Sequence, residues 1–330
     1  MDSKISIIIV THNSEKFIDE CLASLITQRY KAFEIIVVDN CSKDTTRKVI
    51  ERYNVRSYYL KENKGFCYAN NYGVSKAKND IVLLINADCK APKDLLHNLS
   101  KGMIGGNAIV AAYDIPPNTA FKQEPYVPTM TLTGSNTKNV LKKYSAYGKG
   151  AALLINTKLT GGKIFDNDYF MYYEDNYLGL KTNFQGFPVC YCNAYVWHHG
   201  AARTELSPLI TYYSERNRIM LLLTVFDGRT LVKLMPLLAI DLILRFLYYL
   251  PKPNKFLKII KAILWNLFHA PSIIKKRNEF KRYKKRKDSG ILRLCSYKLF
   301  PKYENGFIRI LNKLVREYCK AVNLKTYELS

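Results

Sequence analysis

The sequence DIVLLINADCKAP, which runs from Asp80 to Pro92, decides the fold of this 330-residue chain. Its five apolar residues at 81–85 are rich in β-branched types and have a polar residue on each side. That pattern is typical of a strand buried on both faces, as in the middle of a sheet covered by helices. We therefore predict a central strand that delivers Asn86 and Asp88 to its carboxyl end.

The carboxyl end of this strand is a candidate ligand site, because ligands of open α/β sheets bind there. A carboxylate at Asp88 and an amide at Asn86 suit a hard divalent cation and the phosphates that it carries. On this stretch alone, an aspartate that merely caps the helix expected at 93–101 is an equally good interpretation.

The residues before this strand alternate between strand and helix patterns. We expect strands at 5–10, 33–38 and 55–60, each followed by a helix, and we expect helices again from about residue 207. Strands alternating with helices predict an α/β fold with a parallel, Rossmann-like sheet.

Composition and charge narrow the class of protein. The chain is 48% hydrophobic and 13% aromatic, which excludes a disordered chain and allows a sizeable core. Its formal net charge is +24, and residues 201–330 hold 27 basic but only 9 acidic side chains. This excess suggests an anionic surface as partner. The eight cysteines form no zinc pattern, and the first residues lead straight into a strand, so we expect free thiols, a reducing compartment and no signal peptide.

The basic residues lie beside apolar helix patterns. Residues 256–268 are apolar, with Lys255, Lys258 and Lys261 at helical spacing, and residues 275–287 hold nine Lys or Arg. This arrangement is typical of a helix that lies on an anionic lipid surface. A solvated charged tail is an alternative. A nucleic-acid-binding surface is less favoured, because the basic run follows apolar helices rather than base-stacking aromatic residues on strands.

A series of motifs in fixed order carries a resemblance to a known family. They are IIIVTHN at 7–13, VVDNCSKD at 37–44, NKGF at 63–66, FD at 165–166, FMY at 170–172, ED at 174–175, HHG at 198–200 and RNR at 216–218. Together they resemble a family 2 glycosyltransferase with the GT-A fold, in its rhamnosyltransferase-like branch. The resemblance covers roughly residues 4–220.

The resemblance implies a reaction and an organisation. Residues 1–205 would be a GT-A catalytic domain. The apolar helix patterns and basic charge of residues 206–330, by contrast, predict a helical, membrane-associating region. The enzyme would transfer a hexosyl group, with inversion, from a dTDP-rhamnose-like or UDP-sugar donor to a glycan or lipid-linked acceptor. We expect it at the cytoplasmic face of the cell membrane, attached peripherally.

The resemblance also implies roles for single residues. The donor nucleotide would contact Thr11, Asn13, Asp39, Asn63, Gly65 and Asn86. Asp88 and His198 would hold Mg²⁺ or Mn²⁺, and Asp175 would be the general base, with Glu174 beside it.

Structural alternatives exist for several of these residues. Asp39 suits a helix cap or an Asx turn, and the pair Glu174 and Asp175 suits the positive end of a helix. A lone histidine such as His198 is often structural. Asn86 replaces an acid of the family motif and Tyr177 replaces a further acid after the base. These departures leave an inactive assembly partner of a glycan pathway as a second interpretation.

Overall fold

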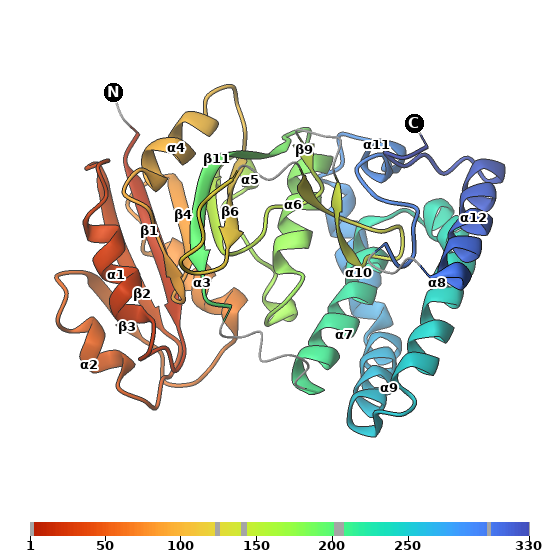
Figure 1. Cartoon of the computed structure of the whole chain (residues 1–330), viewed down its shortest axis with the longest axis horizontal. Helices are drawn as coiled ribbons and strands as arrows, with labels where there is room; N and C mark the ends of the chain where they lie inside the picture. The colour runs from red at the N-terminus through yellow and green to blue at the C-terminus, as the bar shows by residue number, and fades with distance from the viewer. Residues whose placement is uncertain (1–2, 123–125, 140–143, 201–207, 302–304, 330) are drawn as a thin grey trace. The chain divides into compact units, whose positions relative to one another are not determined.

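The computed structural model describes residues 3–122, 126–139, 144–200, 208–301 and 305–329 (Figure 1). The chain forms two compact units, which are not consecutive in sequence. The first comprises Met1–Glu124, Gly148–Leu178 and Phe187–Thr204, and the second comprises Pro125–Tyr147, Gly179–Gly186 and Glu205–Ser330. A compact unit need not fold independently. The predicted domain boundary at residue 205 therefore stays a prediction.

One half of the sheet in the first unit is the parallel sheet that the sequence predicts. Its strands are β1 (Ile5–Thr11), β2 (Phe33–Asp39), β3 (Arg56–Tyr59) and β4 (Ile81–Asn86), in the spatial order β3-β2-β1-β4. The neighbouring strands pair in parallel. The helices between them are α1 (Ile18–Ile26), α2 (Thr46–Ile50) and α3 (Phe66–Ser75). Each crossover helix lets the next strand run in the same direction.

The other half of the sheet is mixed. β10 (Ala152–Asn156) runs antiparallel to both β4 and β6 (Ile109–Ile115). β6 pairs in parallel with β11 (Val189–His198), which pairs antiparallel with the short β5 (Cys89–Lys90). The sequence predicts two short strands at 189–191 and 194–197, whereas β11 is one strand with a register shift between Tyr191 and Tyr195. This mixed α/β sheet is typical of the GT-A fold.

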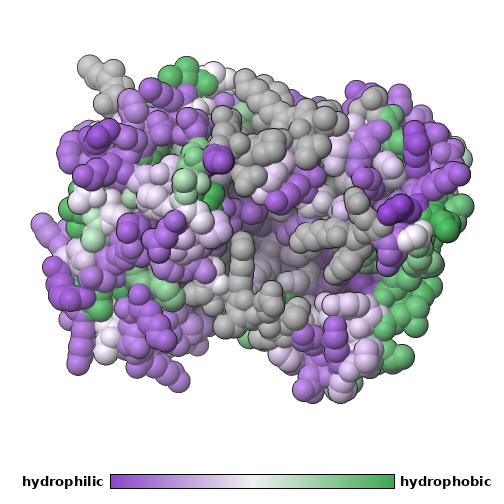
Figure 2. Space-filling view, in the orientation of Figure 1, coloured by the Kyte–Doolittle hydropathy of each residue, from purple (hydrophilic) through white to green (hydrophobic). Residues whose placement is uncertain are grey.

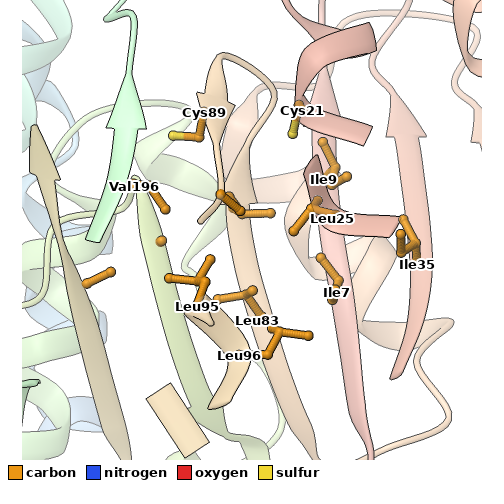
Figure 3. Packing of buried hydrophobic residues seen from close by; sticks show 14 of the residues in the cluster. Ile7, Ile9, Cys21, Leu25, Ile35, Leu83, Cys89, Leu95, Leu96 and Val196 are labelled. Atoms are coloured by element: carbon orange, nitrogen blue, oxygen red, sulfur yellow. The ribbon is translucent and has the colours of Figure 1, made fainter. Parts of the chain in front are cut away.

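The core of the first unit confirms that β4 is a central, buried strand. Val82, Leu83, Leu84 and Ile85 are all buried. Leu83 belongs to a cluster that also holds residues of β1 and of the apolar face of α1 (Figure 3). A strand covered on both faces has no room for polar side chains until it ends. Asn86 and the residues after it are therefore the first polar groups that β4 can present.

Further elements of the first unit surround this sheet. They are α4 (Leu95–Gly102), α5 (Thr157–Thr160) and the 3₁₀ turn η1 (Asn167–Tyr169), followed by α6 (Glu174–Phe184), whose first residues lie in this unit.

The second unit is mainly helical, as the sequence predicts. Its helices are α7 (Pro208–Val225), α8 (Gly228–Tyr249), α9 (Pro253–Phe268), α10 (Ala270–Lys281), α11 (Asp288–Leu292) and α12 (Gly306–Ala321). The short strands are β7 (Val127–Met130), β8 (Asn136–Asn139) and β9 (Tyr144–Ser145). Within the described ranges, no single helix is long and apolar enough to cross a membrane; only α9 and α10, bent by 67° at their junction, meet that test as a pair.

A buried ion network explains the two charges that interrupt the apolar sequence of α8. Asp241 and Arg218 of α7 lie 3.0 Å apart, and Arg245 is 2.8 Å from Asp241 and 2.7 Å from Glu215 of α7. All four side chains face the interior of the second unit, because each is largely buried. α8 therefore turns Asp241 and Arg245 inward.

Candidate functional site

The sheet topology brings Asp88 and His198 together. The antiparallel pairing of β5 with β11 sets His198 opposite Cys89. Cys89 is the residue that directly follows Asp88 in the sequence. His198 Nε2 lies 3.2 Å from Asp88 Oδ1, and its Nδ1 lies 3.7 Å from Asp114 Oδ2 on β6. Burial lowers the pKa of His198, but the carboxylates of Asp114 and Asp88 outweigh it and raise that pKa to about 9. The neighbouring His199 turns instead to Glu20, at 3.1 Å.

A lysine links this cluster to the predicted base. Lys149 Nζ lies 2.7 Å from Asp114 Oδ1, and the Lys149 backbone N–H donates to the hydroxyl of Tyr191 at 2.8 Å. The next residue, Gly150, donates its N–H to Asp175 Oδ2 at 3.2 Å. Burial works to raise the pKa of Asp114, but the charges of His198 and Lys149 hold it below its usual range. The charged groups therefore form a connected series from Asp88 to Asp175.

Asp175 and Glu174 are an acid pair at the first turn of α6. Asp175 Oδ1 accepts the N–H of Asn176 at 2.8 Å, whereas Glu174 is 8% exposed and its Oε2 has no hydrogen-bond partner among the described residues. Burial raises the pKa of both carboxyls, and the charge of Asp175 adds to the rise at Glu174. A carboxyl with a raised pKa is suited to accept a proton near neutral pH.

The segment before α6 is held in a strained conformation. Phe170, Tyr172 and Tyr173 all have left-handed backbones, with φ of 59°, 67° and 68°. Such conformations cost of order 1–3 kcal/mol each and persist only where the surroundings fix them. Part of that support comes from Asn71 of α3, whose side chain bonds the backbone of Phe165 in both directions at 2.8 and 3.0 Å. This strained segment leads directly into the acid pair at the start of α6.

Two predicted motifs meet at Gly65. A Cβ built on this glycine, which has φ of 86°, would lie 2.5 Å from the ring of Phe170. The Asn63 side chain accepts bonds from the Gly65 N–H at 3.0 Å and from Asn40 Nδ2 at 2.8 Å. The NKGF and FMY motifs, a hundred residues apart, are therefore packed together next to the end of β2.

The residues predicted to hold the nucleotide form a second cluster at the ends of β1 and β2. Asp39 is fully buried and accepts bonds from the Thr11 hydroxyl at 3.1 Å, from the Ser42 N–H and from Arg47 Nε at 2.7 Å. Asn13 Oδ1 accepts the N–H of Lys43 at 2.8 Å. Asp39 thus bonds a backbone N–H three residues on, whereas an Asx turn bonds the one two residues on, and it does not cap α2, which begins at Thr46. The nucleotide contacts stay a prediction.

Sequence reasoning missed Asp114 and Lys149. Asp114 is the only charged residue in the buried strand β6, and Lys149 stands between two glycines just before β10. A charged residue in a buried strand and a lysine between two glycines could each have indicated a functional role. Neither residue, however, belongs to a motif of the resemblance described above. The pairing of β6 with β11 sets Asp114 opposite Val196, two residues before His198, and only that register shows their relation.

The residues present fit a divalent metal ion. Asp88, Cys89 and His198 offer ligand atoms within 4.8 Å of one another. Carboxylate and imidazole are common ligands of Mn²⁺ and related ions. Cys89 is less suitable, because burial raises the pKa of its thiol and its Sγ faces the carbonyl of Ala151 at 3.6 Å. Asp88, together with His198 once a cation has displaced its proton, would therefore supply the metal ligands of this site.

The fold is of the GT-A type. Residues 6–151 match the model of the family "Glycosyl transferase family 2". The match covers a little under half of the chain, and this segment is similar to family 2 glycosyltransferases.

Curated relatives agree with this assignment. The chain is 36% identical over 100 residues to the poly(ribitol-phosphate) β-N-acetylglucosaminyltransferase TarS of Staphylococcus aureus, covering 28% of this chain and 18% of TarS. It is 31% identical over 97 residues to the putative teichuronic acid biosynthesis glycosyltransferase TuaG of Bacillus subtilis, covering 28% and 38%. It is 30% identical over 115 residues to the glycosyltransferase GlyA of Streptococcus pneumoniae, covering 34% and 16%. The matches span well under half of each relative, and none of the three is named a rhamnosyltransferase.

Solved structures show the same fold. The mannosyltransferase PcManGT of Pyrobaculum calidifontis, in complex with GDP-Man and Mn²⁺, has a TM-score of 0.54 at 16% identity and covers 98% of this chain and 86% of that one. GalNAc-T7 with UDP, GalNAc and Mn²⁺ has a TM-score of 0.56 at 15% identity and covers 68% and 48%.

Proposed function

We propose that the chain is an inverting glycosyltransferase that moves a hexosyl group from a nucleotide-diphosphate sugar to a hydroxyl of a glycan or lipid-linked acceptor. The observation that carries the proposal is the series of charged groups at Asp88, His198, Asp114, Lys149 and Asp175. It combines ligands for a cation with a carboxyl whose pKa is raised, and sugar transfer needs both.

The proposed reaction uses the two ends of that series, which are the cation ligands at Asp88 and His198 and the carboxyl of Asp175. The acceptor oxygen attacks the anomeric carbon while the bond from that carbon to the diphosphate oxygen breaks, and Asp175 takes the proton of the acceptor hydroxyl. A single displacement of this kind inverts the anomeric configuration. Asp88 and His198 would hold a Mg²⁺ or Mn²⁺ ion, which supplies positive charge to the leaving diphosphate when bound. The Gly150 N–H keeps Asp175 oriented.

The donor is a narrower proposal. We infer a UDP-sugar or a dTDP-rhamnose-like donor, bound near Thr11, Asn13, Asp39, Asn63, Gly65 and Asn86. The names of the structural neighbours, which include UDP and GDP-Man complexes with Mn²⁺, support a nucleotide-diphosphate sugar as the general class.

The proposed location is the cytoplasmic face of the cell membrane, with peripheral attachment. Support comes from the basic run at 275–287, of which Lys275, Lys281 and Lys285 are exposed. The ring of Trp265 in α9 stacks on His269 and lies under Arg216, so it packs within the second unit. The lipid attraction of the basic run would be of order 1 kcal/mol per cation near the surface.

A thermal-shift screen tests the function. Nucleotide sugars are added to the full chain with and without Mn²⁺ or Mg²⁺, and the donor that raises the melting temperature is then used in a turnover assay. Metal-dependent stabilisation by one donor, followed by its hydrolysis or transfer, supports the proposal. Binding without any turnover of the bound donor would favour the inactive assembly partner instead.

A further inference from the structure

The outer face of α8 is apolar over most of its length. Met235, Ile243, Leu247 and Leu250 recur at helical spacing and are all exposed, with Ile243 at 57% and Leu247 at 60%. Between Leu234 and Leu250 the only charged residues are Asp241 and Arg245, and both are committed to the interior ion network. A surface helix of a globular protein normally has the opposite arrangement.

α12 adds a second apolar stripe with a basic border. Phe307, Ile310 and Leu314 lie on one exposed face, and Ile310 and Leu314 are 65% and 64% exposed. Exposed cations follow the adjacent face of the helix at Arg309, Lys313 and Arg316, whereas Lys320 pairs with the exposed Glu317 at 2.9 Å. α12 thus offers apolar contact and positive charge side by side.

The two helices are antiparallel neighbours. Near the start of α8, Lys233 Nζ donates to the carbonyl of Val322 at 2.7 Å, and the Tyr318 hydroxyl donates to the carbonyl of Lys233 at 2.8 Å. Near the end of α8, Tyr248 and Ile308 line one cavity of about 420 Å³. Hydrophobic residues gather over α8 and α12 at the right-hand edge of Figure 2. We name this surface, formed by the exposed residues of α8 and α12, the α8–α12 face.

We propose that the α8–α12 face is the surface by which the protein lies on a bilayer that contains anionic lipid. This inference deepens the membrane location proposed above and rests on it, but it assigns the contact to helices other than α9 and the basic run. The apolar stretch of α8 from Met235 to Leu250 is about 24 Å long at 1.5 Å per residue, which is enough for a helix lying in the interface plane.

Charge favours lipid over a second copy of the chain. Two-fold dimers pair the same patch with itself, so the basic border of α12 would meet another basic border. Like charges brought together in this way oppose association. An anionic bilayer is complementary to the same border, and its acyl region accepts the apolar stripe.

Vesicle flotation of the full chain tests the inference. We compare phosphatidylcholine vesicles with vesicles holding about one-third phosphatidylglycerol, across a salt series. Two variants alter the face without changing charge: Ile243→Gln with Leu247→Gln on α8, and Ile310→Gln with Leu314→Gln on α12. The matched control is Ile26→Gln with Ile104→Gln, a pair of exposed apolar residues in the first unit. Melting temperature and donor binding are recorded for every protein.

We expect each face variant to lower partition into the anionic vesicles on the order of a hundredfold, because two apolar side chains no longer insert. The control variant should bind like the wild type, and all melting temperatures should agree. Unchanged binding of both face variants would overturn the inference. The inference would also be overturned if the wild type formed a dimer and did not bind vesicles, while the face variants were monomers. If the wild type bound vesicles but bound no nucleotide sugar, that result would count against the proposed function and leave the inference about the α8–α12 face standing.

Discussion

Replacing Asp175 with asparagine should stop catalysis while sparing the fold. The carboxylate accepts the N–H groups of Gly150 and Asn176, at 3.2 and 2.8 Å. An amide of the same shape keeps one acceptor oxygen but turns an NH₂ group toward the other N–H, and it cannot take a proton. General base catalysis contributes roughly 10²–10⁴-fold, so the activation free energy should rise by about 3–5 kcal/mol.

The assay is the initial rate of sugar transfer or donor hydrolysis at saturating donor, alongside calorimetric binding of that donor. Donor affinity should change little, so the loss should appear in kcat. Because burial raises the pKa of Asp175, the wild-type rate should increase as the pH rises through that pKa, and the variant should lack this limb. The matched control is Asp168→Asn, an exposed aspartate of the preceding turn. A variant that kept more than about a tenth of the turnover, with chemistry rate-limiting, would refute the assignment.

Three further predictions concern the metal, the buried acid and the glycine contact. Asp88→Ala should abolish Mn²⁺-dependent donor binding in calorimetry while the melting temperature stays near that of the wild type; unchanged affinity would remove Asp88 from the metal site. Glu174→Gln should flatten the fall of stability with pH, because a buried carboxyl with a raised pKa holds its proton in the folded state but loses it in the unfolded state above the ordinary glutamate pKa. Thermal melts from about pH 5 to 8 measure this, and equal slopes for both proteins would contradict it. Gly65→Ala should destabilise the fold by about 2–4 kcal/mol, from its positive φ and its contact with Phe170, whereas Gly105→Ala, with φ of 97° but open space, should cost only the backbone strain. Equal losses in chemical denaturation would show that the Phe170 contact is unimportant.

Much of the first unit follows from local patterns in the sequence. Residues 82–85 of the apolar run are buried as predicted and Ile81 is partly buried, because a strand covered on both faces has no alternative to apolar side chains. The alternation of strands and helices predicted the parallel pairing of β1 to β4, because short crossover helices favour it. The spatial order β3-β2-β1-β4 came from the structure. The motifs at 63–66 and 165–175 also identified segments that the fold packs together.

Other features of the site depend on pairings between distant segments. The antiparallel insertion of β10 and the register of β6 with β11 bring Asp114 and Lys149 into the charged series, and no local pattern encodes a register across 80 residues. The pKa shifts at Glu174 and Asp175 likewise come from burial by neighbouring elements.

In α8, one part of the structure follows from the local sequence and another depends on contacts with a distant segment. Its composition alone established an apolar segment interrupted by Asp241 and Arg245. Which side of the helix meets the solvent was decided by Arg218 and Glu215 of α7, which pair with those two charges inside the unit. Buried charges need partners more than apolar side chains need burial, so the ion network turned the apolar face outward.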